Sequence, residues 1–215
     1  MTRDELLDLY RRSGALLDGH FRLTSGLHSP GYLQCALVLQ HPQHAEMLGR
    51  AIADRLRDVR PTVVLSPALG GVVIGQEVGR ALGVRAIFAE RQDGQLTLRR
   101  GFNIDAADRV VVVEDVMTTG GSTRETIEVA TAAGGQVVGT ASIVDRSPST
   151  LREPQGRPEP GRGATGSGQA ASSLAFDVPF VTLLRIDLPT YEPAACPLCA
   201  QGLPVVKPGS RAVPA

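Results

Sequence analysis

The sequence predicts an α/β fold, in which a doubly wound, mainly parallel sheet has helices on both faces. Short apolar, β-branched runs alternate with segments of helical periodicity from residue 62 onward. The run at 110–113 is all valine, which is typical of a strand buried on both faces of a parallel sheet. Strand–helix–strand units of this kind form right-handed crossovers. The 215 residues suffice for one such domain and are too few for two ordinary ones.

Two helices are expected in the first part of the chain. Thr2 and Glu5 form a capping-box pattern, which begins the first helix. Apolar residues at helical spacing continue it: Leu6, Leu7, Tyr10 and Leu17. Pro42 suits the first turn of the second helix, which extends to about Arg57. Between the two helices, residues 21–39 are assigned no regular element.

The alternating part of the chain supplies the sheet. Strands are expected at 62–65, 86–89, 110–113, 137–144 and 178–186, and helices at about 72–82 and 123–133. Asp93-Gly94 is a hairpin signal, and a short strand at 96–98 follows it. Residues 147–173 are rich in Pro, Gly, Ser and Arg, which predicts a flexible surface insertion. The tail from Pro189 contains several prolines and is expected to extend over the domain surface.

Composition and charge exclude several classes of protein. An apolar fraction of 42% is too high for a chain that is disordered throughout. Lys and Arg number 22, as do Asp and Glu, so the net charge is zero. This balance argues against broad binding to nucleic acid and leaves room for a local cationic pocket. Lys207 is the only lysine, so a mechanism that needs a lysine has one candidate.

The cysteines bear on both location and metal binding. Cys35, Cys196 and Cys199 make an odd number, which indicates a reduced, cytoplasmic protein. The chain shows neither the apolar stretch of a signal peptide nor a run of about 18 apolar residues for a membrane span. The Cys196–Cys199 pair would supply half of a zinc site, but a structural site needs about four ligands. No second pair exists, and Cys35 and the histidines are scattered. A dimer could supply two pairs, but a structural role without metal is favoured.

The sharpest functional signal follows the valine strand. Glu114 and Asp115 come directly after the apolar run, and a small, hydroxyl-rich loop then opens a helix. The loop residues are Thr118, Thr119, Gly120, Gly121, Ser122 and Thr123. In open α/β sheets, ligands bind beyond the carboxyl ends of the strands. Amides of such a loop converge on a phosphate, and carboxylates accept hydrogen bonds from sugar hydroxyls, so the segment predicts a site for ribose 5-phosphate.

This segment resembles the PRPP-binding signature of type I phosphoribosyltransferases over its full length. The resemblance implies the fold of that family: residues 1–215 form a single phosphoribosyltransferase domain, with a small hood from about residues 1–40 and the C-terminal tail. It also implies that Glu114 and Asp115 hold the ribose hydroxyls and that the loop holds the 5′-phosphate. Mg²⁺ is the implied cofactor, bound mainly through PRPP. Residues after the strand at 62–65 would face the pyrophosphate: Ala68, Leu69 and Gly70.

A polar hairpin at 90–101 carries cations at both ends, namely Arg91, Arg99 and Arg100. It resembles the mobile loop that closes over the active site of orotate phosphoribosyltransferases and reaches the neighbouring subunit of a dimer. Those loops typically carry lysines and a histidine, which this hairpin lacks. Arginine stays protonated at neutral pH, so it can stabilise departing pyrophosphate but is a poor proton donor. The three arginines and Asp115 are the expected catalytic residues, and a homodimer is the expected assembly.

Two segments favour orotate as the acceptor base. Residues 21–30 resemble the F-x-L-x-S-G-x-x-S-P stretch in the hood of orotate phosphoribosyltransferases, which often has a lysine where Thr24 stands. Arg146 matches a family arginine that contacts orotate, and a guanidinium fork suits a carboxylate. The implied orotate contacts are Thr24, Ser25, Thr118 and Arg146. The whole pattern is most similar to a bacterial branch of the family, of the Thermus and Deinococcus type.

The resemblance therefore implies transfer of a 5-phosphoribosyl group from PRPP to orotate, giving orotidine 5′-phosphate and pyrophosphate in pyrimidine nucleotide (UMP) synthesis. Two alternatives stay open. A phosphoribosyltransferase for a purine base would keep the PRPP loop but lack the hood stretch and Arg146. A non-catalytic regulator that senses PRPP would need a nucleic-acid surface, against which the zero net charge argues.

Overall fold

The structure is a computed structural model that describes residues 1–23, 25–147 and 176–208. The chain divides into two compact units: Met1–Gln40 with Ile186–Ala215, and His41–Arg185. The smaller unit comprises the two stretches expected as hood and tail, and the larger one contains the alternating elements. Assignment of residues 1–215 to a single domain stays a prediction. Thr24 and all but the first residue of the expected insertion lie outside the described residues.

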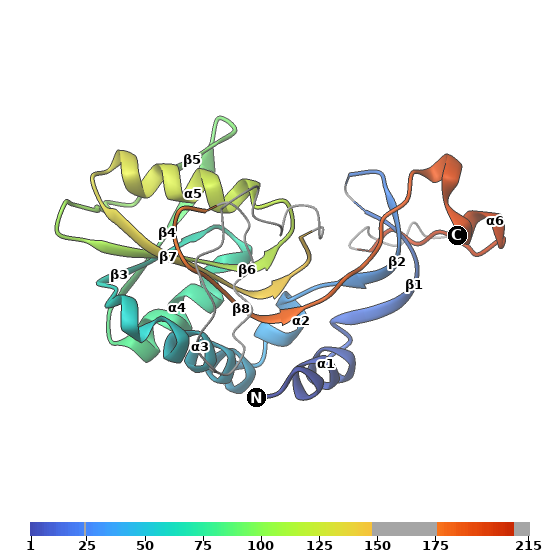
Figure 1. The fold of residues 1–215 in the computed structure, drawn as a ribbon. Coiled ribbons are helices and arrows are strands. Elements are labelled where there is room, and N and C mark those ends of the chain that lie inside the picture. Colours follow the sequence, from blue (N-terminus) through green and yellow to red (C-terminus); the bar gives the residue numbers. More distant parts are fainter. Residues whose placement is uncertain (24, 148–175, 209–215) are drawn as a thin grey trace, which may run out of the picture. The chain divides into compact units, whose positions relative to one another are not determined.

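A six-stranded sheet forms the centre of the larger unit, with the order β5-β4-β3-β6-β7-β8 (Figure 1). The strands are β3 Val63–Pro67, β4 Arg85–Gln92, β5 Gln95–Leu98, β6 Arg109–Met117, β7 Gln136–Asp145 and β8 Phe180–Arg185. Every neighbouring pair is parallel except β4 and β5, which form an antiparallel hairpin. A mainly parallel sheet with helices around it confirms the predicted fold class.

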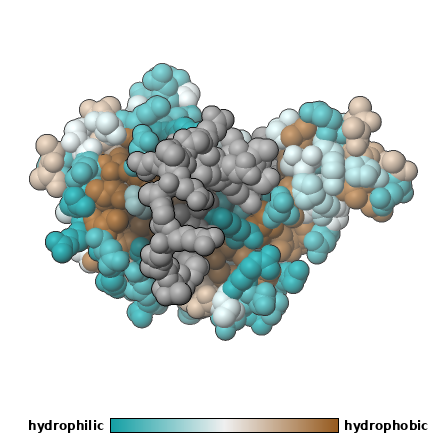
Figure 2. Space-filling model, viewed as in Figure 1, coloured by the Kyte–Doolittle hydropathy of each residue, from teal (hydrophilic) through white to brown (hydrophobic). Residues whose placement is uncertain are grey.

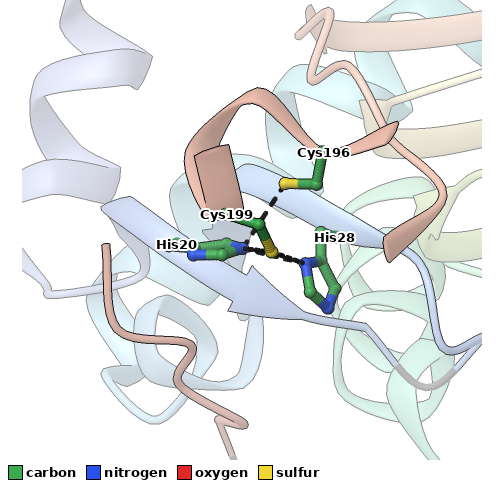
Figure 3. Close-up of side chains that lie close together, drawn as sticks. All are labelled: His20, His28, Cys196 and Cys199. Atoms are coloured by element: carbon green, nitrogen blue, oxygen red, sulfur yellow. Dashed lines mark hydrogen bonds between the residues drawn. The ribbon is translucent and has the colours of Figure 1, made fainter. Parts of the chain in front are cut away.

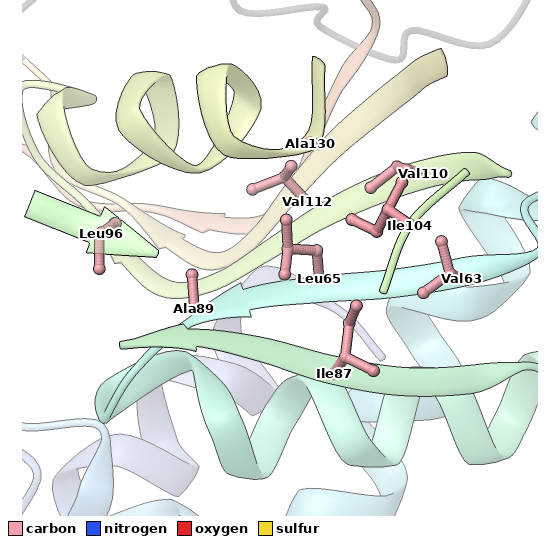
Figure 4. Close-up of a cluster of buried hydrophobic side chains, with 9 residues drawn as sticks. All are labelled: Val63, Leu65, Ile87, Ala89, Leu96, Ile104, Val110, Val112 and Ala130. Atoms are coloured by element: carbon pink, nitrogen blue, oxygen red, sulfur yellow. The ribbon is translucent and has the colours of Figure 1, made fainter. Parts of the chain in front are cut away.

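Helices cover both faces of this sheet (Figure 1). Helices α3 (Pro42–Leu56) and α4 (Gly70–Leu82) lie on one face, and α5 (Gly121–Ala132) lies on the other. Alternate residues of each strand point to the same face, so β3, β4 and β6 together build one apolar layer beneath α5. Figure 4 shows its members: Val63, Leu65, Ile87, Ala89, Leu96, Ile104, Val110, Val112 and Ala130. The sheet is therefore a rigid platform for the loops at its carboxyl edge.

The smaller unit begins with helix α1 (Arg3–Arg12). Its capping box is present as predicted, because the Thr2 amide donates to Glu5 Oε2 at 2.7 Å and the Glu5 amide to Thr2 Oγ1 at 3.3 Å. The expectation that Leu17 continues this helix is wrong. Ser13 ends the helix, Gly14 turns the chain at φ 63°, and Leu17 lies in a strand.

An antiparallel hairpin follows, formed by β1 (Leu16–Arg22) and β2 (His28–Leu33), and then a short helix α2 (Ala36–Leu39). The sequence did not predict these elements, because glycine, proline and polar residues interrupt any alternation there. The tail holds the hairpin through two backbone bridges, Phe21 with Val206 and His28 with Tyr191. Besides its extended parts, the tail contains a 3-10 turn η3 (Pro193–Ala195) and helix α6 (Pro197–Ala200).

Within the part of the chain that the structure describes, no helix has the length and apolar character needed to cross a membrane.

Candidate functional site

The acidic pair lies where β6 passes from the core to the surface. Val110 to Val113 are fully buried, whereas Glu114 and Asp115 are half-buried. Strand β6 continues through both carboxylates to Met117, four residues beyond the predicted strand end. Because β6 lies between β3 and β7, the pair stands at the carboxyl edge of the sheet's central strands, where open α/β folds bind ligands.

Burial dominates the electrostatics of this pair. It raises the pKa of Glu114 to about 7, helped by the neighbouring charge of Asp115 and opposed by a hydrogen bond that the Thr123 hydroxyl donates to Glu114 Oε2 at 2.6 Å. Burial also raises the pKa of Asp115, although the Val116 amide donates to its Oδ1 at 2.9 Å. Because burial destabilises the charged form of both carboxylates, hydrogen-bond donors or cations of a ligand would stabilise that charged form.

The loop after the pair leads into the N-terminus of α5. Thr118 and Thr119 are exposed, and Gly120 takes the N-cap position with φ 75°, a left-handed conformation that glycine adopts without strain. Glycine has no side chain with which to cap the helix. The first-turn amides and the helix dipole therefore favour an anion here, as the sequence predicted.

Thr123 and Arg124 behave differently from the rest of the loop. The Thr123 hydroxyl is buried and donates to Glu114, so this residue positions the carboxylate. Its predicted role at the phosphate stays a prediction. Arg124, which sequence reasoning missed, donates from Nη1 to the Thr119 carbonyl at 3.1 Å and adds a cation beside the loop. Its position directly after the hydroxyl-rich run, at Thr123, is the sequence feature that could have identified it.

The loop between β3 and α4 lies directly against Asp115. A Cβ on Gly70 would lie 2.7 Å from Asp115 Oδ1, so the close approach requires glycine. The Ala68–Leu69 peptide bond is cis, and Leu69 is 87% exposed. The Ala68 amide donates to the Ala89 carbonyl at 2.8 Å, so it is engaged within the sheet. Leu69 and Gly70 are then the stronger candidates for binding pyrophosphate.

Arg146 lies beside the start of the loop at 118–123. Strands β6 and β7 pair in register up to Met117 and Asp145, and the Arg146 amide then donates to the Met117 carbonyl at 2.8 Å. The fully buried Asp145 fixes this corner: its Oδ1 accepts from the Ser147 amide at 2.8 Å, and its Oδ2 lies 3.4 Å from Arg185 Nε. Asp145 and Arg185 were not singled out from the sequence.

The predicted polar hairpin is formed by β4 and β5, and its tip is exposed and hydrophilic (Figure 2). Arg91 pairs with Glu125 of α5, with Nη1 and Oε2 3.0 Å apart. Arg100 forms a two-pronged pair with Glu90 at 2.7 and 2.8 Å, which lowers the pKa of that carboxyl. Arg99 is exposed. Arg91 and Arg100 are thus each held by an acidic side chain.

The expected base-binding residues near the N-terminus belong to the smaller unit. Ser25 lies in the turn between β1 and β2, where its Oγ accepts from the Leu27 amide at 3.4 Å. Thr24 lies outside the described residues.

A second group of polar side chains also lies in the smaller unit. His20 and His28 of the hairpin meet Cys196 and Cys199 of the tail (Figure 3). The expectation that the histidines are too scattered to join the cysteines is therefore wrong for two of them. The reason is the backbone pairing of the tail with β1 and β2, which sequence spacing does not reveal.

Comparisons with known proteins agree with this geometry. A family model described as "Phosphoribosyl transferase domain" matches residues 36–156, more than half of the chain. The orotate phosphoribosyltransferase of Heliobacterium modesticaldum is 50% identical over 213 residues, covering 98% of this chain and 100% of the relative. That of Pelotomaculum thermopropionicum is 47% identical, covering 99% and 100%. The chain also resembles a crystal structure of Mycobacterium tuberculosis orotate phosphoribosyltransferase in complex with PRPP, with TM-score 0.59, 26% identity and coverage of 85% and 95%.

Proposed function

The chain belongs to the orotate phosphoribosyltransferases, within the phosphoribosyl transferase family, and we propose that it transfers the 5-phosphoribosyl group of PRPP to orotate. The products are orotidine 5′-phosphate and pyrophosphate, and the reaction is a step of pyrimidine nucleotide synthesis. One observation supports the proposed roles of particular residues. The acidic pair lies at the end of β6, the proposed phosphate loop follows it, and Arg146 lies beside that loop.

PRPP occupies the carboxyl edge of the sheet in this proposal. Its 5′-phosphate binds the amides and hydroxyls of the loop at 118–123, at the N-terminus of α5. Its ribose hydroxyls donate to Glu114 and Asp115. Its pyrophosphate lies along the loop at 68–70. The backbone of Gly70 leaves no room for a side chain beside Asp115, and this closeness supports placing ribose and pyrophosphate side by side.

Orotate binds next to the ribose, and Arg146 donates two parallel hydrogen bonds to its carboxylate. Thr118, Ser25 and Thr24 are the further proposed contacts. The hydrogen bond from the Arg146 amide to the Met117 carbonyl supports this arrangement, because Met117 directly precedes Thr118 and the bond holds Arg146 beside it. A lysine at 146 would keep the charge but lose the planar fork.

The reaction needs positioning and charge stabilisation more than a protein nucleophile. The base nitrogen attacks C1 of the ribose opposite the departing pyrophosphate, so that carbon is inverted. Positive charge develops on the ribosyl ring, near the carboxylate of Asp115. Negative charge develops on pyrophosphate, which Arg91, Arg99 and Arg100 stabilise after the hairpin closes.

Mg²⁺ is the proposed cofactor, bound mainly through PRPP. Glu114 and Asp115 fit such an ion, since they offer the oxygen ligands that Mg²⁺ prefers. When bound, the ion neutralises charge on the pyrophosphate. A homodimer in which the β4–β5 hairpin reaches the neighbouring active site is also proposed, as is a cytoplasmic location. The free thiols of Cys35, Cys196 and Cys199 fit a reducing compartment.

An absorbance assay tests the function directly. The full chain with PRPP and Mg²⁺ should consume orotate and leave hypoxanthine, guanine and uracil unchanged. Arg146→Lys should raise the KM for orotate roughly 10- to 100-fold, while PRPP affinity stays the same. This change corresponds to the loss of about 1–3 kcal/mol expected when one of two charged hydrogen bonds to the carboxylate is removed. Turnover of a purine base instead would overturn the assignment of the acceptor. PRPP binding without turnover of any base would favour a sensor.

A further inference from the structure

The hairpin and the tail of the smaller unit bring four metal-binding side chains together (Figure 3). His20 comes from β1, His28 from β2, and Cys196 and Cys199 from the start and the body of α6. Their nitrogen and sulfur atoms all lie within 4.8 Å of one another. His20, His28 and Cys196 are buried, and Cys199 is exposed. None of these residues is among the proposed PRPP or orotate contacts.

The separations match those of a tetrahedral zinc site. Cys196 Sγ lies 3.5 Å and Cys199 Sγ 3.7 Å from His20 Nε2, and Cys199 Sγ lies 3.3 Å from His28 Nδ1. Zn–S bonds of about 2.3 Å and Zn–N bonds of about 2.0–2.1 Å at tetrahedral angles place sulfur and nitrogen about 3.5 Å apart. The two ring nitrogens, 2.9 Å apart, need to separate by only about 0.4 Å to reach the corresponding N–N distance.

Hydrogen bonding alone does not account for the cluster. His20 Nδ1 lies 2.8 Å from the Leu203 carbonyl oxygen, which can only accept, so Nδ1 carries a proton. In the neutral ring, Nε2 then offers one lone pair. Three atoms approach that lone pair: His28 Nδ1 and the two sulfurs. One cation placed among the four atoms would use the lone pair of each, whereas hydrogen bonds can satisfy His20 Nε2 only once.

The surrounding backbone holds the ligands in place. The Leu203 carbonyl orients the His20 ring, in the manner of the outer hydrogen bonds that fix metal-bound imidazoles. The amides of His28 and Tyr191 donate to each other's carbonyls at 2.9 and 2.8 Å. The Ala200 amide donates to the Cys196 carbonyl at 3.2 Å, which closes the turn that aligns the two thiols.

We propose that His20, His28, Cys196 and Cys199 bind one Zn²⁺ ion in a closed, structural site. Thiolate and imidazole ligands select zinc over Mg²⁺, which prefers oxygen. Four protein ligands leave no open coordination position, so the ion is structural and takes no part in the transfer reaction. Each thiol releases its proton to solvent when it binds the ion. The ion cross-links the β1–β2 hairpin to the C-terminal tail.

Metal analysis of the full chain, purified under reducing conditions without an affinity tag, tests the proposal. Plasma mass spectrometry should find about one zinc per chain. Cys199→Ser and His28→Asn should lose it, while the matched controls Cys35→Ser and His41→Asn, at residues outside the cluster, should keep it. Protein without zinc that also takes up none when Zn²⁺ is added, or a Cys199→Ser variant with full zinc content, would overturn the proposal.

Wild-type protein alone provides a second test, in case a variant fails to fold. Replacement of zinc by Co²⁺ should produce the intense visible bands of a tetrahedral site together with sulfur-to-cobalt charge-transfer absorption. Titration of the thiols with an organomercurial should release one zinc per chain, detected with a chromogenic chelator. Co²⁺ spectra that lack sulfur ligation would contradict the assignment.

Discussion

The carboxyl group of Glu114 lies where a buried strand reaches the surface, and its pKa of about 7 follows from that burial. Ribose hydroxyls donate best to the ionised carboxylate, so in the proposed site protons and PRPP would compete for this residue near neutral pH. Thr123 reduces the effect by donating to Oε2. The sequence predicted the pair as a ribose site, but it could not predict the proton affinity, which depends on what the fold packs around the side chain.

Glu114→Gln is expected to remove a pH dependence of stability. The folded-state pKa of Glu114 lies at about 7, above the ordinary 4.5, so the folded protein binds the proton more tightly than the unfolded chain. Wild type therefore loses stability as the pH rises from about 4.5 to 7, by up to about 3 kcal/mol. The variant has no charge to bury, so it should be similar to wild type near pH 5 and more stable than wild type at pH 8.

Urea denaturation of the ligand-free protein at the two pH values measures this difference. Glu128→Gln, on the exposed face of α5, is the matched control and should keep the wild-type pH dependence. A Glu114→Gln variant with that same dependence would show that another group is responsible.

At the scale of elements, the end of β6 packs closely against the loop before α4. The close approach is at Gly70, which has no side chain to collide with Asp115. Strand β6 was predicted to end at Val113, where the apolar run stops. Its pairing with β7, which continues to Met117 and Asp145, extends it. Local residue preference missed this extension because the hydrogen bonds come from a neighbouring strand. The hairpin β1–β2 escaped prediction for a different reason, since glycine, proline and polar residues interrupt the alternation of its strands.

Gly70→Ala should weaken PRPP binding by about 10-fold or more, because the new Cβ would lie 2.7 Å from Asp115 Oδ1 and displace the carboxylate. Calorimetric titration with PRPP measures the effect. Gly139→Ala, in β7, is the matched control: its nearest neighbour is at 3.6 Å, an ordinary contact distance. Equal PRPP affinity for the two variants would mean that Asp115 does not hold the ribose.

At the scale of the whole molecule, the sequence predicted what a single continuous segment determines. The acidic pair, the loop before α5 and the β4–β5 hairpin each lie within one segment, and each strand of the large sheet was predicted from its own apolar run. Groups assembled from distant segments were not. Cys196 and Cys199 stand more than 160 residues from the histidines they approach, and no periodicity records that approach.

Mixing two inactive variants tests the proposed dimer. If the hairpin of one subunit serves its neighbour's site, Asp115→Asn chains mixed with Arg99→Ala, Arg100→Ala chains should regain about a quarter of wild-type activity, since half of the dimers are mixed and each has one complete site. Light scattering coupled to size exclusion should first establish the dimer. Dimers that exchange subunits but regain no activity would place the hairpin over its own site.

The pairing of the tail with the first hairpin sets an order of events during synthesis. Residues 41–185 contain every strand of the large sheet, so this unit needs no residue of the tail to complete its sheet. Strands β1 and β2 are synthesised before the large sheet, yet β1 lacks its partner Val206 until after the large sheet has been made. This hairpin is thus expected to reach its native form after the large sheet, and ribosome-bound chains that end before Val206 should leave it open to proteases.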